Sequence, residues 1–268
     1  MPKHQDAMLA EVRMRSIVEI VRSKGETTVT ELCRTFGVSP ATIRNDLTRL
    51  ESMNLLKRTH GGAISSQRAG YELTTVEKQV KNVREKCAMA EVALRFISPG
   101  DSIVLDTGTT TFELAKRLVG VEGLTVMTND VQIAGYLESC SEVNVMLVGG
   151  LVRRNYHCTV GQYAVDFITN LHVDKAFIAA NGIAPERGLS TPSVELAGVK
   201  SKFIDIAEKV YVLADSSKID KNSFALIAPL SSVDVLIMDD RAPEPFVSQV
   251  ESQGVRVELA PVRQDMNI

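Results

Sequence analysis

Residues 38–51, VSPATIRNDLTRLE, decide the fold of the N-terminal part of this chain. Ser39 is a preferred helix cap, and Pro40 suits the first helical position. Apolar residues then recur every three or four positions, which predicts the buried stripe of a helix: Ile43, Leu47, Leu50 and Met53. The opposite face carries short or hydrogen-bonding side chains, which are not typical of a merely solvated surface.

The segments on either side predict the rest of a small domain. An earlier helical stripe ends at Lys24-Gly25, and its apolar members are Leu9, Val12, Ile17, Ile20 and Val21. Thr28 or Thr30 can cap a short second helix that Gly37 closes. Residues 55–65, LLKRTHGGAIS, alternate and turn at Gly61-Gly62, which predicts a β-hairpin. We therefore predict a winged helix-turn-helix over residues 1–66.

The polar face of the third helix is suited to a DNA groove. Ala41 allows close approach, while Arg44 and Asn45 can make paired hydrogen bonds to guanine and adenine edges. The basic hairpin suits the phosphate backbone or the minor groove. The predicted DNA contacts are Ser39, Ala41, Thr42, Arg44, Asn45, Thr48, Arg49, Lys57, Arg58 and His60.

Plainer readings of these residues stay open. The whole segment can be an ordinary amphipathic helix of a small helical domain. Arg49 can pair with Asp46 or Glu51 on its own helix, and His60 can be a solvated turn residue. Agreement between the cap, the stripe, the polar face and the basic hairpin favours the DNA-binding interpretation.

Charge is distributed unevenly along the chain. Residues 1–68 hold 11 Lys and Arg against 7 Asp and Glu, a net charge of +4. The remainder holds 19 against 26, a net charge of -7, and the two parts sum to -3. This asymmetry predicts that the N-terminal part, and not the rest, meets a polyanion.

Composition excludes several classes of protein. No apolar run approaches the roughly 18 residues of a membrane span, and the start MPKHQDAM lacks the apolar region of a signal peptide. The 4 cysteines have no CxxC spacing, so they indicate neither a zinc site nor a disulfide framework. We expect a soluble, cytoplasmic protein without a metal or cofactor.

A linker at residues 67–80 and a larger α/β domain at residues 81–268 follow the winged helix. Residues 66–80 show no clear amphipathic period. From about Val83, β-branched runs alternate with helix-length segments, which predicts a mainly parallel sheet covered on both faces. The predicted strands are SIVLD, LTVMT, VNVMLV, KAFIAA, KVYVLA, VDVLIM and VRVELA.

The first of these strands ends in LDTGTTTFELAKRL, residues 105–118. Asp106 closes the strand, Gly108 permits a tight turn, and three threonines lead into a helix, which predicts an anion site. Neither a P-loop nor a GxGxxG fingerprint is present, so a small phosphorylated ligand fits better than ATP or NAD. Threonine capping of a structural helix is the alternative.

Other strand ends carry polar residues that topology brings to the same edge of the sheet. Arg153 follows the third strand, and Lys218 in ADSSK can neutralise a phosphate or simply be solvated. Glu195 lies where a helix begins, so a helix-dipole role competes with a contact to a ligand hydroxyl.

The motif TTVTELCRTFGVSPATIRNDLTRLESMNLLKRTHGGA resembles the N-terminal signature of the DeoR family of bacterial sugar-metabolism regulators, and the match continues through nearly the whole chain. The usual pattern has two consecutive basic residues in the recognition helix, and here the second is Asn45. Many relatives carry an acidic residue at the position of Leu196.

The resemblance implies a sensor domain similar in fold to ribose-5-phosphate isomerase and glucosamine-6-phosphate deaminase, with a phosphorylated sugar or sugar alcohol as effector. The positions that match the family's effector site are Asp106, Gly108, Thr109, Thr110, Thr111, Asn129, Gly149, Gly150, Asp174, Gly182, Glu195, Lys200, Asp215 and Lys218.

Two classes of function compete. The first is an effector-controlled transcription factor, most often a repressor in this family, which binds operator DNA as a homo-oligomer such as a dimer or tetramer. The second is an isomerase-like enzyme with a DNA-binding module, in which Asp106, Glu195 and Lys218 supply the acid and base. A groove-facing helix and a basic wing favour the transcription factor, because catalysis requires neither. A structural scaffold explains neither feature.

Overall fold

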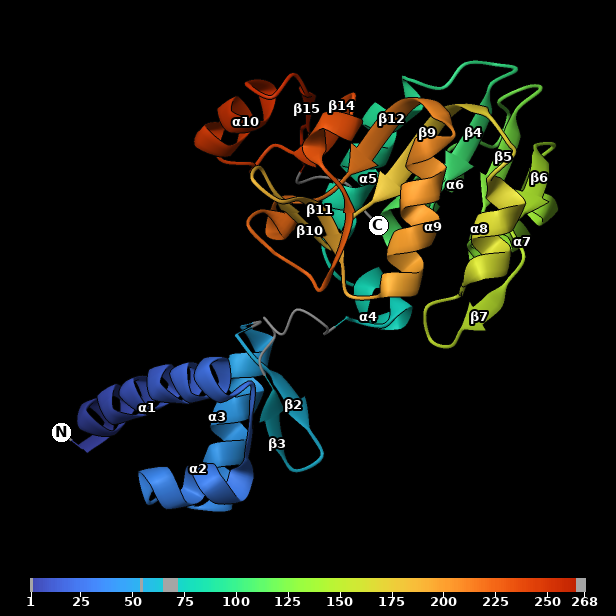
Figure 1. Ribbon diagram of the computed structural model, residues 1–268. Coiled ribbons are helices and arrows are strands. Elements are labelled where there is room, and N and C mark those ends of the chain that lie inside the picture. The colour runs from blue at the N-terminus through green and yellow to red at the C-terminus, as the bar shows by residue number, and fades with distance from the viewer. Residues whose placement is uncertain (1, 54, 65–71, 264–268) are drawn as a thin grey trace. The chain divides into compact units, whose positions relative to one another are not determined.

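The computed structural model of the chain describes residues 2–53, 55–64 and 72–263 (Figure 1). The chain forms two compact units, Met1–Tyr71 and Glu72–Ile268, and each has its own hydrophobic core. The expected domain end at residue 66 and the expected linker residues 67–71 lie outside the described residues. Residues 72–80, which we expected to be linker, belong to the C-terminal unit.

In its described residues the N-terminal unit has the expected helices and hairpin. The helices are α1 (Pro2–Lys24), α2 (Val29–Phe36) and α3 (Pro40–Ser52), and the strands are β1 (Glu26–Thr28), β2 (Lys57–Thr59) and β3 (Gly62–Ile64). β3 pairs antiparallel with both β1 and β2. The unpredicted β1 therefore fastens the wing hairpin to the helical part through backbone hydrogen bonds.

Capping residues fix where α2 and α3 begin. The Thr28 hydroxyl accepts from the Glu31 backbone N–H at 3.1 Å, and the Glu31 carboxylate accepts from the Thr28 N–H at 2.8 Å. Ser39 caps α3 by accepting from a backbone N–H of its first turn at 3.2 Å. The Ser39 cap is confirmed, and Thr28 rather than Thr30 caps α2. Each cap of this kind contributes about 1 kcal/mol.

The core of the N-terminal unit contains most of the predicted stripes. Its best-buried side chains, none more than 2% exposed, are Ile17, Val21, Leu32, Ile43, Leu47, Leu50, Leu56 and Ala63. Two predicted members were wrong. Met53 is 57% exposed because α3 ends at Ser52, and Val12 is 58% exposed because the buried face of α1 runs through Met14 and Ile17. The side chain of Leu9 lies outside the described residues.

Glycine at position 62 is required by the close approach of two strands. A Cβ atom on Gly62 would lie 1.9 Å from the Thr27 carbonyl oxygen of β1. At the neighbouring Gly61 a Cβ atom would meet nothing within 4 Å. The hairpin turn lies at His60-Gly61, one residue earlier than predicted, because Gly62 is already part of β3.

Gly62→Ala should therefore destabilise the N-terminal unit, by about 1–3 kcal/mol or more, because β3 must move away from β1. Gly61→Ala is the matched control and should change its stability by less than about 0.5 kcal/mol. Differential scanning calorimetry of the full-length chain measures both. Equal melting of the two variants would contradict the strand packing described here.

The C-terminal unit is built on a seven-stranded parallel sheet. Its strands in spatial order are β15 (Arg256–Ala260), β14 (Val235–Asp239), β12 (Ala207–Leu213), β9 (Val173–Ala179), β4 (Ser102–Leu105), β5 (Thr125–Thr128) and β6 (Asn144–Leu147). These are the seven runs that the sequence predicted as strands. The α/β class with a mainly parallel sheet is confirmed.

Helices cover both faces of this sheet (Figure 1). One face packs against α5 (Val83–Leu94), α6 (Thr109–Ala115) and α7 (Val131–Cys140), and the other against α8 (Gln162–Ile168), α9 (Val194–Asp205) and α10 (Glu244–Glu251). Because both faces are buried, the strands are almost continuously apolar.

Several short elements were not predicted. They are α4 (Thr75–Gln79), the hairpin β7 (Leu151–Arg153) and β8 (Cys158–Val160), the small antiparallel sheet β10 (Gly182–Ala184), β11 (Gly188–Thr191) and β13 (Ala225–Ala228), and the 3-10 turns η1 (Ser216–Lys218) and η2 (Leu230–Ser232). Pieces of three to five residues are too short to show a period. Every helix in the described part of the chain is too short or too polar to traverse a lipid bilayer.

Candidate functional site

The predicted groove face of α3 is at the surface. The exposed members of the predicted DNA-contact set are Ser39, Ala41, Arg44, Asn45, Thr48, Arg49, Arg58 and His60, whereas Thr42 and Lys57 are half-buried. The Thr48 hydroxyl donates to the Arg44 carbonyl oxygen at 2.8 Å. Arg44 and Asn45 are both exposed, on a part of the helix surface that the core does not use.

An ion pair fixes the orientation of α3. Asp46 is 8% exposed and accepts from Arg13 of α1, from Nε at 2.6 Å and from Nη2 at 3.2 Å. Asp46 is thus committed to α1, and Glu51 accepts from the Arg58 backbone N–H at 2.8 Å. The alternative in which Arg49 neutralises either of these carboxylates is therefore not the arrangement in this structure.

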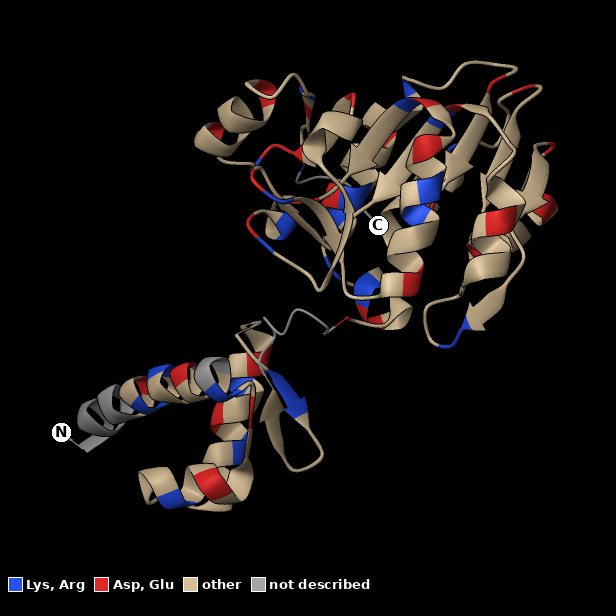
Figure 2. Cartoon of the chain, viewed as in Figure 1, with Lys and Arg blue, Asp and Glu red and all other residues tan. Residues whose placement is uncertain are grey.

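The wing is attached to the recognition helix by one of its own cations. Arg58 Nη1 donates to the Thr48 hydroxyl at 2.6 Å, while the backbone of the same residue is held by Glu51. His60 is exposed at the turn. Figure 2 shows the Lys and Arg colour running along β2. Arg58 therefore both places the wing and keeps a positive charge beside the groove face of α3.

A buried ion pair lies at the carboxyl end of β4 and β9. Lys200 of α9 donates to Asp106 Oδ2 and, at 2.8 Å, to the Ala179 carbonyl oxygen, while the Ala179 N–H donates to the same Oδ2 at 3.0 Å. Asp106 is 0% exposed and Lys200 is 2% exposed. Burial raises the pKa of Asp106, and the charge and hydrogen bond of Lys200 oppose that rise.

The second carboxylate oxygen of Asp106 has no partner. Asp106 Oδ1 is the buried side-chain atom, among those the structure describes, that lacks a hydrogen bond. An unsatisfied buried acceptor of this kind is unfavourable by about 1–3 kcal/mol. A donor such as a ligand hydroxyl would relieve that penalty.

The three threonines that begin α6 do not have equivalent roles. The Thr111 hydroxyl donates to the carbonyl oxygens of Asp106 and Gly108, at 2.6 and 2.9 Å. Its single hydroxyl proton is therefore used inside the protein, and its backbone N–H is the group that the prediction offers to a phosphate. The hydroxyls of Thr109 and Thr110 make no hydrogen bond within the described part of the chain, and both residues are at most 9% exposed.

Several predicted site residues shape the backbone at this edge. The buried Asn129 accepts from the Thr107 N–H at 3.2 Å and donates to the Thr159 carbonyl oxygen at 3.0 Å. A Cβ atom on Gly150 would lie 2.8 Å from the Val160 carbonyl oxygen, and one on Gly182 would lie 2.0 Å from that of Lys221. Gly149 is exposed, with nothing near it. Thr107, which the sequence analysis missed, donates to Asp130 at 2.6 Å.

Asp174 lies at the wrong end of the sheet for an effector site. It is the second residue of β9 and accepts from Ser102, the first residue of β4, through backbone N–H at 2.7 Å and hydroxyl at 2.6 Å. Those hydrogen bonds lower the pKa of Asp174. Five residues of strand separate it from Ala179, roughly 16 Å at 3.3 Å each. Its predicted role in effector binding was therefore wrong.

Lysines gather around the strand ends. Lys218 ends the turn η1 after β12, and its Nζ lies 3.9 Å from Asp215 Oδ2. Asp215 also accepts from Asn82 Nδ2 at 2.9 Å. Lys86 of α5 is 6% exposed and donates to backbone carbonyls of the α4 segment, and burial lowers its pKa to about 8. Asn82 and Lys86 were missed because they lie just after the expected linker, without a motif.

The segment that precedes and includes α4 adds a further cation. Burial lowers the pKa of Lys78, Glu72 opposes that effect, and the charges of Lys218 and Lys200 lower it further. Lys78 therefore lies close enough to Lys218 and to Lys200 for their charges to act on it. Figure 2 shows Lys and Arg colour on both α4 and the middle of α9.

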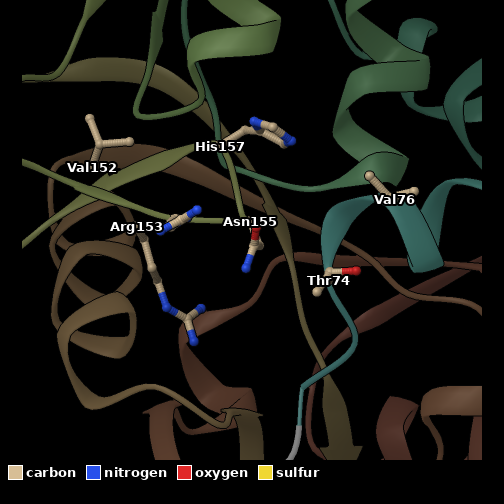
Figure 3. Close-up of a pocket in the computed structure, with 7 residues that line it drawn as sticks. Thr74, Val76, Val152, Arg153, Asn155 and His157 are labelled. Carbon is tan, nitrogen blue, oxygen red and sulfur yellow. The ribbon is translucent and has the colours of Figure 1, made fainter.

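Arg153 is engaged by the α4 segment. Its Nη1 donates to Glu72 Oε2 at 2.6 Å, and its guanidinium lies 3.8 Å from the centre of the Tyr156 ring. The same arginine lines an open hollow of about 420 Å³ between the α4 segment and the β7–β8 hairpin (Figure 3). The residues around the hollow are Thr74, Val76, Val152, Arg153, Arg154, Asn155 and His157.

Glu195 begins α9 and is exposed. Its carboxylate accepts from the Ser193 hydroxyl at 2.9 Å, and hydrogen bonds to its own backbone N–H and to Ser193 lower its pKa. Glu195 therefore lies in the first turn of α9, as its helix-dipole role requires. The neighbouring Leu196, at the position where many relatives carry an acidic residue, is buried against Cys158 and Val160.

Family comparison agrees with this division of the chain. Residues 13–69 match the DeoR-like helix-turn-helix domain, and residues 81–240 match the DeoR C terminal sensor domain. The chain belongs to the DeoR family. Its C-terminal unit is therefore a DeoR sensor domain, with Asp106 and Lys200 at its centre.

Relatives along the whole chain are named as transcriptional regulators. GlpR of Haloferax volcanii is 36% identical and covers 93% of this chain and 98% of its own length. The repressor GlcR of Bacillus subtilis is 32% identical, with 96% and 98% covered. The repressor AccR of Agrobacterium fabrum is 35% identical, with 85% and 88% covered.

Among solved structures, the chain is similar to a D-ribose-5-phosphate isomerase in complex with phospho-erythronic acid. The likeness has 18% identity and a TM-score of 0.39, and it covers 51% of this chain and 53% of the isomerase. A TM-score this low supports no conclusion about the ligand or activity of the DeoR-family chain.

Breaking the buried pair should destabilise the sensor domain. Lys200→Met leaves Asp106 buried without a counter-ion and should lower the free energy of unfolding by about 3–5 kcal/mol. Lys200→Met with Asp106→Asn should lower it by less than the sum of the single changes, because the two groups interact directly. Urea unfolding at neutral pH measures both, and simple additivity would contradict the pair.

The loss of unfolding free energy caused by Lys200→Met should also depend on pH. Without Lys200, nothing of comparable size opposes the rise in pKa that burial imposes on Asp106. The folded state then binds a proton more tightly than the unfolded state, so the stability of this variant relative to wild type rises as the pH falls. A deficit that stays constant between neutral and acid pH would contradict this reading.

Proposed function

We propose that this protein is a DNA-binding repressor of a carbohydrate-utilisation operon, and that a phosphorylated sugar or sugar alcohol controls its affinity for DNA. The observation that carries the proposal is the unpartnered Oδ1 of Asp106, whose other carboxylate oxygen binds Lys200. The charges of Lys200 and Lys218 both act on Lys78. A sugar phosphate supplies both groups that this arrangement lacks: a hydroxyl that donates to the carboxylate and an anion for the lysines.

On the DNA side, α3 enters the major groove with Arg44 and Asn45 facing base edges. Both are exposed and consecutive in the sequence. Arg44 can donate two hydrogen bonds to a guanine edge, and Asn45 can donate one to an adenine edge and accept one from it. Asn45, in place of the usual second basic residue, shifts one contact toward adenine. Lys57 and Arg58 of the wing contact the backbone and stabilise any sequence.

On the sensor side, the hydroxyls of Thr109 and Thr110 and the ammonium of Lys218 hold the phosphate. Asp106 faces the sugar hydroxyls, since like charge keeps its carboxylate away from the phosphate. Lys200 keeps Asp106 in place. Asn129, Gly150 and Gly182 act indirectly by shaping the strand ends.

A repressor that reads a palindromic operator needs two copies of α3. We propose a homo-oligomer, a dimer or tetramer, in which the effector favours an arrangement that spaces the DNA-binding domains wrongly for two half-sites. Operator release then follows from a shift between arrangements, without any ligand contact to the DNA-binding domain.

The enzymatic alternative has weaker support. An isomerase needs a positioned base and acid near the reacting carbons. One oxygen of Asp106 is occupied by Lys200 and the Ala179 N–H, and the carboxylate of Glu195 is exposed at the start of α9. Incubation with sugar phosphates and a search for ketose–aldose exchange tests it directly.

Substitutions in α3 and the wing should have distinct effects on DNA binding. Arg44→Ala and Asn45→Ala should each weaken binding to the operator by about 1–3 kcal/mol and relax base preference at one position. Lys57→Ala should weaken all sequences about equally and flatten the salt dependence. Fluorescence anisotropy on operator and random duplexes separates the two classes. Unchanged base preference in Arg44→Ala would exclude α3 as the reading helix.

A thermal-shift screen against phosphorylated sugars and alditols should identify the effector. A ligand at about 100 times its dissociation constant adds roughly 2.7 kcal/mol to the stability of the folded state. Thr110→Val with Lys218→Ala should abolish both this shift and the release of DNA by the effector, while operator affinity stays at the wild-type level.

Lys116→Ala is the control, because Lys116 pairs with Glu113 at the far end of α6. If the double variant releases DNA at the wild-type effector concentration, the pocket has been assigned wrongly.

A further inference from the structure

The carboxylate of Glu72 occupies a site built from two cations. Its Oε1 accepts from Lys78 Nζ at 2.6 Å and its Oε2 accepts from Arg153 Nη1 at 2.6 Å. The side chain is only 3% exposed. Tyr156 completes the site, because its hydroxyl donates to the Glu72 carbonyl oxygen at 3.1 Å and its ring packs under the Arg153 guanidinium. The arrangement has the chemistry of an oxyanion-binding site, with Glu72 as the resident oxyanion.

The cations of this site are not fully neutralised by that carboxylate. Burial would raise the pKa of Glu72, but the charges and hydrogen bonds of Lys78 and Arg153 outweigh it and leave that pKa below its ordinary value. Lys78 in turn is repelled by Lys218 and Lys200. One carboxylate therefore bridges two cations, and a phosphate with two negative charges would satisfy these two cations better.

Access and chain position distinguish Glu72 from an ordinary structural ion pair. Arg153 lines the hollow of about 420 Å³ in Figure 3, so one of the two cations can be approached from solvent. In the sequence, Glu72 is eight positions after Ile64, the last residue of the wing strand β3. It is the first residue of the sensor domain and precedes α4, so its release frees the start of that domain.

We propose that Lys78 and Arg153 form an oxyanion subsite of the effector pocket, and that Glu72 fills it when no ligand is bound. The phosphate of the effector, which Thr109, Thr110 and Lys218 also hold, competes with the carboxylate of Glu72 for these two cations. Occupancy by ligand detaches Glu72, and with it the start of the sensor domain. This inference rests on the proposed phosphorylated effector and adds to it the contact through which the ligand acts.

Inorganic phosphate is the probe for this competition, titrated calorimetrically into the full-length protein at constant ionic strength. Glu72→Gln keeps the size of the side chain but removes the competing charge. If the subsite is open about a tenth of the time, the variant should bind phosphate about tenfold more tightly than wild type. Adding Arg153→Gln to Glu72→Gln should remove this gain in affinity. If Glu72 had only a structural role, Glu72→Gln would produce no gain in affinity.

Hydrogen exchange gives a second readout in the wild-type protein. Saturating phosphate should accelerate exchange in residues 72–80, although a bound ligand ordinarily slows it. Asp101→Asn is the matched control, because it removes a carboxylate from the ion pair with Lys175 at the amino end of the sheet. It should leave both the affinity for phosphate and the exchange rates unchanged.

The outcomes separate this inference from the proposed function. Equal affinity of wild type and Glu72→Gln for phosphate, or slower exchange in residues 72–80, overturns the subsite and leaves a phosphorylated effector in place. Failure of both proteins to bind either phosphate or any sugar phosphate overturns the subsite and the proposed effector together.

Discussion

The buried pair of Asp106 and Lys200 is the interaction on which the sensor domain depends. It joins the end of β4, the end of β9 and the middle of α9, with exposures of 0% and 2%. Two charges taken out of water are unfavourable unless further hydrogen bonds satisfy them. Here Ala179 supplies two, and one carboxylate oxygen still lacks a donor. A hydroxyl group of the proposed effector would supply the missing donor.

Much of this architecture could be predicted from residue patterns, and the failures have physical reasons. Ser39, the α3 stripe and the seven strands follow from capping and from continuous apolar runs, which are local signals. Asp174 was assigned to the effector site because its sequence position does not show that it lies at the amino end of its strand. The hydroxyl of Thr111 was predicted to face the ligand because a hydroxyl that donates to the nearby backbone and one that binds an anion occur in the same motif. Glu72, Lys78 and Lys86 were missed because long-range contacts, with no motif of their own, give them their roles.

The two domains have separate cores, and we propose that the chain that joins them, or an oligomer, carries the signal between them. A ligand shifts such an equilibrium only by as much as its affinities for the two arrangements differ. In our proposal, competition for Lys78 and Arg153 supplies such a difference. In one arrangement Glu72 occupies the subsite, and in the other the ligand occupies it. The departures at Asn45 and Leu196 then concern which operator and which sugar are recognised and leave this coupling unchanged.

If binding of the effector and binding of the operator are linked, each must weaken the other by the same factor, and this equality can be measured directly. The affinity of the effector is measured calorimetrically for the free protein and for the protein saturated with operator duplex. We predict that the operator weakens effector binding by a factor of the order of 5–150. The effector should weaken operator binding by the same factor. Identical effector affinities in the two titrations, with operator release still observed, would contradict it.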